Sequence, residues 1–330
     1  MPAKGSGRPW PELGNPPNGL SHQAHSYLVW YSSRGYSSET LVNMSDKFRM
    51  FLEWCSDRAL TSVEELTPHL FERYQRHVSE KRTKSGSKIS TRTQLESLGF
   101  LIHFCGYLVR TGIVQHNAAS IITLPRTPQR LPRSLMTLEE MDILLSQPDL
   151  STALGIRDRA MLEVVFATAL RSVELVALSL EDFDSSRKVL HVGSGPNRRE
   201  REIPIYSRTV DWVHRYFDES RIVFSLEHPE DRALFIGQLG KRLAAGYVEH
   251  LFGYYAQSAG FEHGSIFRRI RDTVGVEMFD SGADARYVQE VLGHVCLQST
   301  LKYARLSISR LCKVHGNTHP AELNRRGYRK

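Results

Sequence analysis

Apolar residues recur every three to four positions through most of the first 112 residues, the spacing of one buried face of an α-helix. Four such segments follow one another, at 20–35, 38–60, 61–82 and 93–112. Ser38 suits the N-cap of the second segment. Thr61 or Ser62, with Glu64 or Glu65 shortly after, suits the start of the third. The pattern therefore predicts an N-terminal bundle of about four helices.

Prolines interrupt this pattern at positions 125, 128 and 132, and a helix interior excludes proline. We therefore expect a linker at 123–135, between a helical domain at 20–122 and a second domain at 136–330. Residues 1–19 are rich in Pro and Gly and contain no apolar signal core. We expect them to form a flexible tail on a cytoplasmic protein.

The second domain begins with a helix capped by Thr137. Two more helices are expected within 155–184, joined near Thr168 to Arg171. Segment 188–205 predicts two strands around a Gly-Pro-Asn turn, and 232–237 predicts one short strand. Three further helices are expected at 241–260, 266–282 and 285–294. The predicted fold is therefore mainly α, with a small antiparallel sheet in the second domain.

Composition adds a modest hint about partners. Hydrophobic residues make up 41% and charged residues 24% of the 330 residues, as in ordinary globular proteins, and no run reaches the roughly 18 apolar residues of a membrane span. The formal net charge of +7 favours a polyanionic partner such as DNA. The four cysteines have no metal-site spacing, so we expect reduced, buried thiols and no bound metal.

The positive charge is concentrated in two stretches without acidic residues, 81–92 and 125–133. Each can be a solvated loop or linker, but two uncompensated clusters favour contact with DNA phosphates. The expected DNA-binding residues in them are Lys81, Arg82, Lys84, Lys88, Arg92, Arg126, Arg130 and Arg133.

Near the end of the chain, the stretch GHVCLQSTLKY places His294 and Tyr303 nine residues apart. On one unbroken helix they would lie on opposite faces. Gly293 suits the left-handed end of the preceding helix, and Ser299 or Thr300 suits the cap of a new one. A turn between two helices therefore allows the two rings to meet.

The segment IRDRAMLEVVFATALRSVELVALSLEDFD resembles the first arginine box of the tyrosine recombinases, which include phage integrases, integron integrases and Xer-type recombinases. FRRIRDTVGVEMFDSGADARYVQEVLGHVCLQSTLKYARL resembles their second box. The resemblance extends over about 20–310 and is sharp over 155–310. It implies a SAM-like core-binding domain in front of a catalytic domain, and the cutting and rejoining of DNA through a covalent phosphotyrosine.

By this resemblance, Tyr303 is the nucleophile, Arg171 and Arg271 are the two catalytic arginines, His294 is the catalytic histidine, and Glu174 supports the first box. Two guanidiniums suit this chemistry because charge grows on the phosphate oxygens in the transition state. Taken singly, the tyrosine can be a packing residue, the histidine a cap, and the arginines surface ion-pair partners. Their joint order along the chain favours the catalytic interpretation.

Three features depart from the family pattern. Ser194 stands where the family has a lysine general acid on a strand turn, although Arg198, Arg199 or Arg201 can supply positive charge there. Arg198 and Arg199 are also expected to bind DNA. Arg268 occupies the histidine position of the second box, and arginine is a poor proton donor at neutral pH. Third, Asp272 stands where the family often has a second histidine, and Ala169 replaces a glycine. These changes affect proton transfer more than fold.

The leading hypothesis is a site-specific recombinase of a mobile element, acting as a tetramer on double-stranded DNA with inverted-repeat sites, without metal, ATP or other cofactor. A second recombinase can share the tetramer. The alternative is a recombinase-derived DNA-binding protein with weak or partner-dependent catalysis. A helix-turn-helix regulator ranks last, because it leaves Tyr303 and both arginine boxes unexplained.

Overall fold

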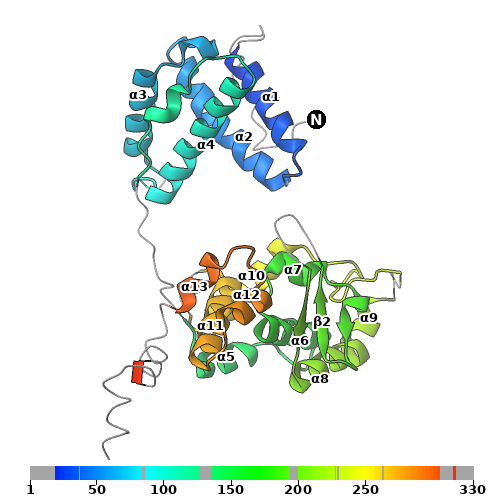
Figure 1. The fold of residues 1–330 in the computed structure, drawn as a ribbon. Helices are drawn as coiled ribbons and strands as arrows, with labels where there is room; N and C mark the ends of the chain where they lie inside the picture. The colour runs from blue at the N-terminus through cyan, green and yellow to red at the C-terminus, as the bar shows by residue number, and fades with distance from the viewer. Residues whose placement is uncertain are drawn as a thin grey trace, which may run out of the picture. The chain divides into compact units, whose positions relative to one another are not determined.

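The computed structural model divides the chain into two compact units, Met1–Gln129 and Arg130–Lys330 (Figure 1). It describes the residues 19–36, 38–83, 86–125, 135–193, 200–226, 228, 230–261, 264–304 and 315–316. The expected tail lies almost wholly outside this set, and the domain limits drawn from the sequence remain predictions. No helix among the described residues is long and apolar enough to cross a membrane.

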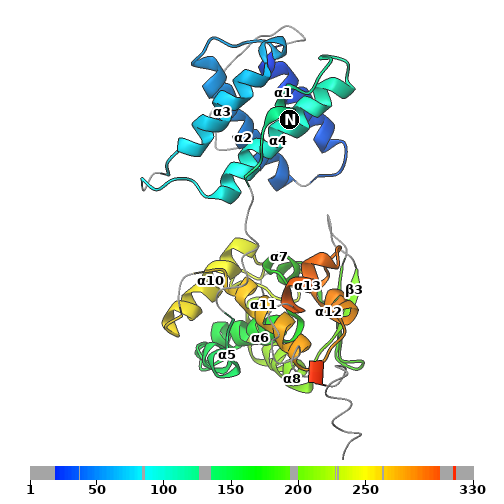
Figure 2. The same ribbon diagram turned by 60° about the vertical axis from the view of Figure 1, so that its left-hand side comes forward.

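The N-terminal unit is a bundle of four α-helices, as the apolar spacing predicts (Figures 1 and 2). The helices are α1 (Leu20–Ser32), α2 (Ser38–Ser56), α3 (Pro68–Glu80) and α4 (Thr91–Arg110), with short 3-10 turns η1 (Val63–Glu65) and η2 (Ala118–Ile121). Aromatic side chains fill its core, and Tyr27 meets Phe48 and Phe104 edge to face at centroid distances of 5.7 and 5.5 Å. This core belongs to the unit alone.

The third helix begins later than predicted. Ser62 and Glu65 do form a capping box, but it closes η1 rather than α3. Thr67 caps α3 instead, accepting a hydrogen bond from the Leu70 N–H at 3.3 Å. Pro68 then takes the first helical position, where its missing N–H costs nothing.

The basic stretch between α3 and α4 folds back on itself. The Ile89 N–H donates to the Lys81 carbonyl at 3.0 Å, and the Thr83 N–H donates to the Ser87 carbonyl at 2.7 Å. Arg82 and Lys88 face each other in an antiparallel bridge and are exposed. The described part of the predicted loop is therefore a small hairpin on which Arg82 and Lys88 are exposed to solvent.

The second unit is mainly helical and contains one small sheet. Its helices are α5 (Leu138–Leu145), α6 (Ala153–Thr168), α7 (Ser172–Ala177), α8 (Ser207–Tyr216), α9 (Ile222–Phe224), α10 (Ala245–Ser258), α11 (Ile266–Asp280), α12 (Ala285–Leu292) and α13 (Gln298–Ala304). A 3-10 turn, η3 (Leu180–Asp182), and a π-helical turn, η4 (Phe217–Arg221), interrupt them. The sheet has the antiparallel order β1 (Phe183–Asp184), β2 (Val189–Val192) and β3 (Arg201–Pro204). The predicted fold class is confirmed.

The sheet differs from the prediction in two details. β1 was not expected, and it pairs Phe183 with Leu190 of β2. The strand predicted at 232–237 forms only isolated bridges, including one between Ser179 and Ala233. Its apolar residues are buried, so the apolar run marked burial in the core rather than a place in the sheet.

The cysteine prediction is partly wrong. Cys55 and Cys105 are free and buried, as expected, but Cys296 is free and exposed. It lies in the turn between α12 and α13, where the backbone turns at the surface. Cys312 lies outside the described residues.

Candidate active site

Arg171 lies at the start of α7 because the chain turns sharply after α6. Ala169 takes a left-handed conformation, with φ of 52°, which ends α6 and redirects the backbone. Arg171 then precedes the first residue of α7, and its N–H donates to Oε2 of Glu174 at 2.9 Å. Its guanidinium donates to Oε1 of the same carboxylate at 3.0 Å, yet 37% of the side chain stays exposed. Arg171 is thus oriented and still open to a ligand.

Glu174 is buried and holds a second arginine that the site prediction omitted. Arg201 of β3 is also buried, and its guanidinium lies 3.3 Å from Oε1 of Glu174. Burial raises the pKa of Glu174, but Arg201 and the backbone and guanidinium of Arg171 outweigh it and lower the pKa overall. Glu174 therefore stays ionised and fixes both arginines.

Arg201 also joins the sheet to the end of α12. Its Nε donates to the Val291 carbonyl at 3.1 Å. Gly293 makes room for it, because a Cβ at that position would lie 2.6 Å from Cζ of Arg201. Arg201 is the last residue of the stretch GSGPNRRER, and the sequence indicated it only as a source of positive charge.

Arg271 of α11 connects the two turns that carry Arg171 and His294. It donates to the Ala169 carbonyl at 2.7 Å and also to the Leu292 carbonyl. Burial, followed by the nearby charge of Arg171, lowers its pKa to about 10, so it remains protonated at neutral pH. Arg271 therefore supplies buried positive charge and fixes the geometry of both turns.

His294 lies just after the left-handed Gly293, as the sequence predicts. Its Nδ1 is 2.8 Å from Oγ1 of Thr300, and its backbone carbonyl accepts a hydrogen bond from Gln289 at 2.8 Å. Burial, followed by the nearby charges of Arg271 and Arg171, lowers its pKa to about 3. The imidazole is therefore neutral at physiological pH.

Thr300 does not cap the last helix, as was expected, because α13 already begins at Gln298. Thr300 is buried within α13 and is the partner of the His294 ring. The Thr300 hydroxyl, which the local sequence pattern predicted to cap the helix, therefore forms a tertiary hydrogen bond with His294 instead.

Tyr303 of α13 is fully buried, with 0% of its surface exposed. Its hydroxyl donates to Oδ1 of Asp272 at 2.7 Å, so the hydroxyl lies in a polar environment although it is buried. Burial raises the pKa of Tyr303, and the charge and hydrogen bond of Asp272 raise it further. The ring stacks on His294 at a centroid distance of 6.1 Å, as the nine-residue spacing across a turn allows.

The predicted catalytic residues lie close together within the second unit, where α11, α12 and α13 pack on one another and α12 packs on β3 (Figure 2). Electrostatic coupling links His294 to Arg171 and Arg271, and Arg271 to Tyr303. Arg268 is the most peripheral of the set. Its side chain is 75% exposed and its Nε lies 3.5 Å from Oδ2 of Asp272.

The strand turn where the family has a lysine general acid lies largely outside the described residues. Ser194, Arg198 and Arg199 lie outside the described residues. Lys188, the nearest lysine, takes a left-handed conformation and donates to Oγ of Ser207 at 2.8 Å. It is therefore engaged with the start of α8.

The other predicted DNA-binding residues lie in the N-terminal unit or beyond the described part. Lys81, Arg82 and Lys88 belong to the hairpin after α3, and Arg92 forms an ion pair with Glu96 at 2.9 Å. Lys84, Arg126, Arg130 and Arg133 lie outside the described residues.

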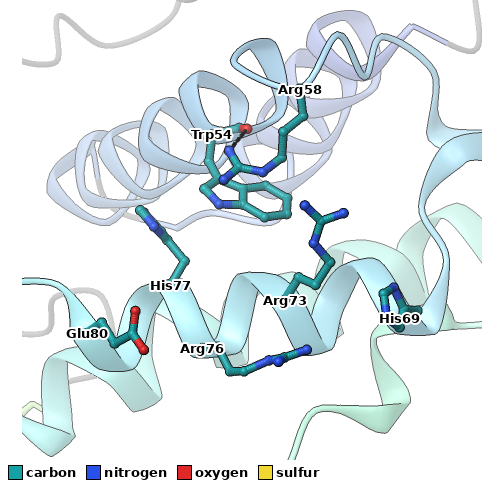
Figure 3. Close-up of a pocket in the computed structure, with 7 residues that line it drawn as sticks. All are labelled: Trp54, Arg58, His69, Arg73, Arg76, His77 and Glu80. Atoms are coloured by element: carbon teal, nitrogen blue, oxygen red, sulfur yellow. Dashed lines mark hydrogen bonds between the residues drawn. The ribbon is translucent and has the colours of Figure 1, made fainter.

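A basic pocket that the sequence did not reveal lies between the end of α2 and α3 (Figure 3). Its volume is about 540 Å³, and it is lined by Trp54, Arg58, His69, Arg73, Arg76, His77 and Glu80. The Arg58 guanidinium lies over the Trp54 ring at 4.1 Å, and Arg73 and His77 rise from α3 toward it. We call these seven residues the α3 pocket.

The α3 pocket is suited to an anion. Its three arginines outnumber its one glutamate, and the arginines are exposed. Burial lowers the pKa of His77, and Lys81 and Arg58 lower it further, so the positive charge comes from the arginines at neutral pH. An arginine guanidinium can donate two parallel hydrogen bonds to the oxygens of one phosphate group.

Comparison with known proteins identifies similar families and folds. The phage integrase family model matches residues 134–310. Tyrosine recombinase XerC 2 of Ralstonia nicotianae is 33% identical over 291 residues, which cover 88% of this chain and 83% of that protein. Tyrosine recombinase XerD of Lacticaseibacillus casei is 31% identical over 287 residues, which cover 87% and 94%.

Two solved structures share the fold at lower identity. XerH site-specific recombinase bound to palindromic difH substrate, a post-cleavage complex, aligns with a TM-score of 0.69 at 18% identity, over 90% of this chain and 84% of that one. The Tn1549 transposon integrase in complex with a circular intermediate DNA aligns with a TM-score of 0.68 at 16% identity, over 89% and 99%.

Proposed function

The chain belongs to the phage integrase family and is a site-specific tyrosine recombinase, and we propose that it cleaves and rejoins DNA through a 3′-phosphotyrosine formed by Tyr303. The observation that carries this assignment is the grouping of Arg171, Arg271 and His294 beside that tyrosine. The same positions match the family motifs in order along the chain.

In this reaction the Tyr303 oxygen attacks a backbone phosphate and the 5′ oxygen leaves. Negative charge grows on the phosphate oxygens, and the two guanidiniums neutralise it. Arg171 is aimed by Glu174 while more than a third of its side chain remains exposed to a ligand. His294, neutral because its pKa is near 3, contributes one N–H to a phosphate oxygen without adding charge.

We further propose that the reaction needs neither a metal ion nor ATP. The phosphotyrosine ester conserves the free energy of the phosphodiester, so that rejoining needs no external energy source. Arginines that stay charged at neutral pH take the role that a metal ion plays in other phosphoryl-transfer enzymes. The test is cleavage in excess EDTA without nucleotide, where the rate should stay within about twofold of that with Mg²⁺.

The decisive experiment uses a nicked suicide DNA that carries the cognate site. The wild-type protein should form a denaturant-resistant protein–DNA adduct, and the Tyr303→Phe variant should form none while retaining its gel shift. A wild-type protein that shifts the DNA without an adduct would instead favour the alternative, a recombinase-derived binding protein with weak or partner-dependent catalysis.

Arg171 offers a second test of the site. The Arg171→Ala variant should form the adduct at least 100-fold more slowly, because a preorganised charge at the reacting phosphate is lost. Its DNA affinity should change by less than about threefold, since this is one phosphate contact among many. Equal losses of binding and cleavage would make Arg171 a general DNA contact.

The DNA-binding surface proposed for the N-terminal unit comprises the hairpin after α3 and the α3 pocket. Lys81, Arg82 and Lys88 lie on the hairpin, and the arginines of the pocket lie on and beside α3. The related XerH and Tn1549 structures contain DNA, which supports double-stranded DNA as the partner.

We also propose assembly into a tetramer on a pair of inverted-repeat sites, in the service of a mobile element, with a second recombinase as a possible subunit. The positive formal charge of the chain, +7, supports binding to DNA but says nothing about subunit number. Mass photometry on DNA that carries one or two sites tests the assembly. Two sites should yield four protomers, and a constant single protomer per site would contradict it.

A further inference from the structure

Asp272 is the group in direct contact with the proposed nucleophile. It is buried on α11, next in sequence to Arg271, and accepts the Tyr303 hydroxyl at 2.7 Å. Within the described residues no other hydrogen bond of that hydroxyl is formed. The histidine whose ring stacks on Tyr303 directs its Nδ1 to Thr300 instead.

The contact is held from several sides. Lys302 donates to the same Oδ1 at 3.1 Å, and Arg268 lies 3.5 Å from Oδ2. Gly275, one turn further along α11, lets the Tyr303 ring approach the helix, because a Cβ there would lie 3.0 Å from Cδ2 of the ring. Asp272 and the hydroxyl are thus fixed against each other by packing and by charge.

Such a contact serves proton transfer. A phenol with an ordinary pKa near 10 is a weak nucleophile at neutral pH, and its proton becomes acidic only as its oxygen bonds to phosphorus. A carboxylate within hydrogen-bond distance can take that proton in the transition state. An arginine at position 268, where the family has histidine, cannot.

We propose that Asp272 is the proton acceptor of Tyr303 during DNA cleavage, an inference that rests on the proposed function. As the Tyr303 oxygen bonds to phosphorus and the bond from phosphorus to the 5′ oxygen breaks, the phenol proton moves to Oδ1. The 5′ oxygen takes a proton from water. Asp272 then returns its proton to solvent beside Lys302, whose side chain is 40% exposed, so no net proton is consumed. Rejoining runs the same steps in reverse.

The charged and titratable groups around this pair come from three elements. They are Arg268, Arg271 and Asp272 of α11, His294 of the turn after α12, and Lys302 and Tyr303 of α13. Arg271, whose pKa is about 10, keeps its proton over most of the range from pH 7 to 9, and His294, whose pKa is about 3, is neutral throughout. In this range the wild-type cleavage rate should therefore vary little with pH.

The test is single-turnover cleavage of the suicide DNA by full-length variants. Asp272→Asn preserves size and an acceptor oxygen but removes the base, and it should slow adduct formation at least 100-fold with DNA affinity unchanged. Its rate should then rise about tenfold per pH unit between pH 7 and 9, because only ionised phenol reacts. Asp272→His, which restores a base, should retain most of the cleavage.

Formate supplies a second readout that does not depend on one variant. Asp272→Ala should cleave slowly, and added formate should restore cleavage, while Tyr303→Phe should not respond. Asp272→Asn cleaving as fast as the wild type or faster would show that the carboxylate only restrains the tyrosine. Slow cleavage with a flat pH profile and no formate rescue would reduce Asp272 to a structural residue. A wild-type protein without any adduct would overturn the proposed function itself.

Discussion

At the scale of single residues, His294 links the chemistry of the site to the stability of the fold. Its pKa is about 3 in the folded protein, against an ordinary value of 6.5, because burial and neighbouring arginines disfavour the charged ring. As pH falls, the unfolded chain therefore binds a proton before the folded one does. The stabilising contribution is fully present above pH 6.5 and is lost between about pH 6.5 and 3.

This predicts a difference between wild type and His294→Asn. Between pH 7.5 and 5.0, the free energy of unfolding should fall more steeply for the wild type, by up to about 1.4 kcal/mol per pH unit. Urea unfolding at a series of pH values measures it. Parallel curves for the two proteins would mean that the histidine is freely solvated when folded.

The candidate site residues were proposed from sequence because the family motif places them in order, and their catalytic roles remain predictions. Arg171, His294 and Tyr303 needed no coordinates to be proposed. The contact of Arg201 with Glu174 and that of Tyr303 with Asp272 did need coordinates, because both join residues far apart in the chain. Sequence gives the residue type at each position but does not show which helix faces meet.

At the scale of elements, the turn after α12 depends on one glycine. Gly293 has φ of 60°, and a Cβ there would meet the fixed guanidinium of Arg201. We expect Gly293→Ala to destabilise the protein by about 2 kcal/mol or more, because left-handed strain adds to the displacement of a buried ion pair. Thermal unfolding measures the loss.

Gly112→Ala is the matched control, since Gly112 also has positive φ, 73°, but a Cβ there meets nothing within 4 Å. It should show the strain alone, about 1 kcal/mol. An equal loss of stability in the two variants would show that the contact with Arg201 does not contribute to the effect. Adduct formation should fall only in the Gly293 variant, because the turn carries His294.

The α3 pocket allows a matched test of DNA contact in the N-terminal unit. Arg58 stacks on Trp54 at 4.1 Å and lines the pocket, whereas Arg34 stacks on Trp30 at 4.0 Å and does not. Arg73→Ala combined with Arg58→Ala should lower the slope of log affinity against log salt by about two. Arg34→Ala should leave this slope unchanged.

Fluorescence anisotropy on duplex DNA at several salt concentrations provides the measurement. Retention of the wild-type slope by the double variant would exclude phosphate contact at the pocket. In that case the pocket would be free to bind a different anionic group.

Elements were predictable where their signals are local. The Thr137 cap and the Gly293 stop are both present, because a cap is decided by neighbours in sequence. The start of α3 and the role of Thr300 were mispredicted. Thr67, rather than Thr61 or Ser62, caps α3. Thr300 forms a hydrogen bond with His294 instead of capping α13.

At the scale of the whole molecule, the two units have separate cores. The fragment 130–330 should therefore fold alone, with a cooperative thermal transition by circular dichroism. It should bind cognate DNA at least tenfold more weakly than the full chain, because the basic residues of the first unit are absent. A fragment that fails to melt cooperatively would show that the second core needs the first.

The prolines at 125, 128 and 132 predicted a linker between two domains, because proline interrupts the interior of a helix. The basic pocket could not be predicted, because its arginines are spaced as on any solvated helix face and become a pocket only beside Trp54. A linker can therefore be predicted from local sequence signals such as proline, whereas a surface pocket depends on how the helices pack.

Tyr303 has no exposed surface in the free protein. A cell contains millions of phosphodiesters for every recombination site, and an oxygen that none of them can touch poses no hazard to the genome. The oxygen of the proposed nucleophile is therefore shielded from DNA in the free protein. Reagents that nitrate accessible phenols should therefore spare this tyrosine in the free protein.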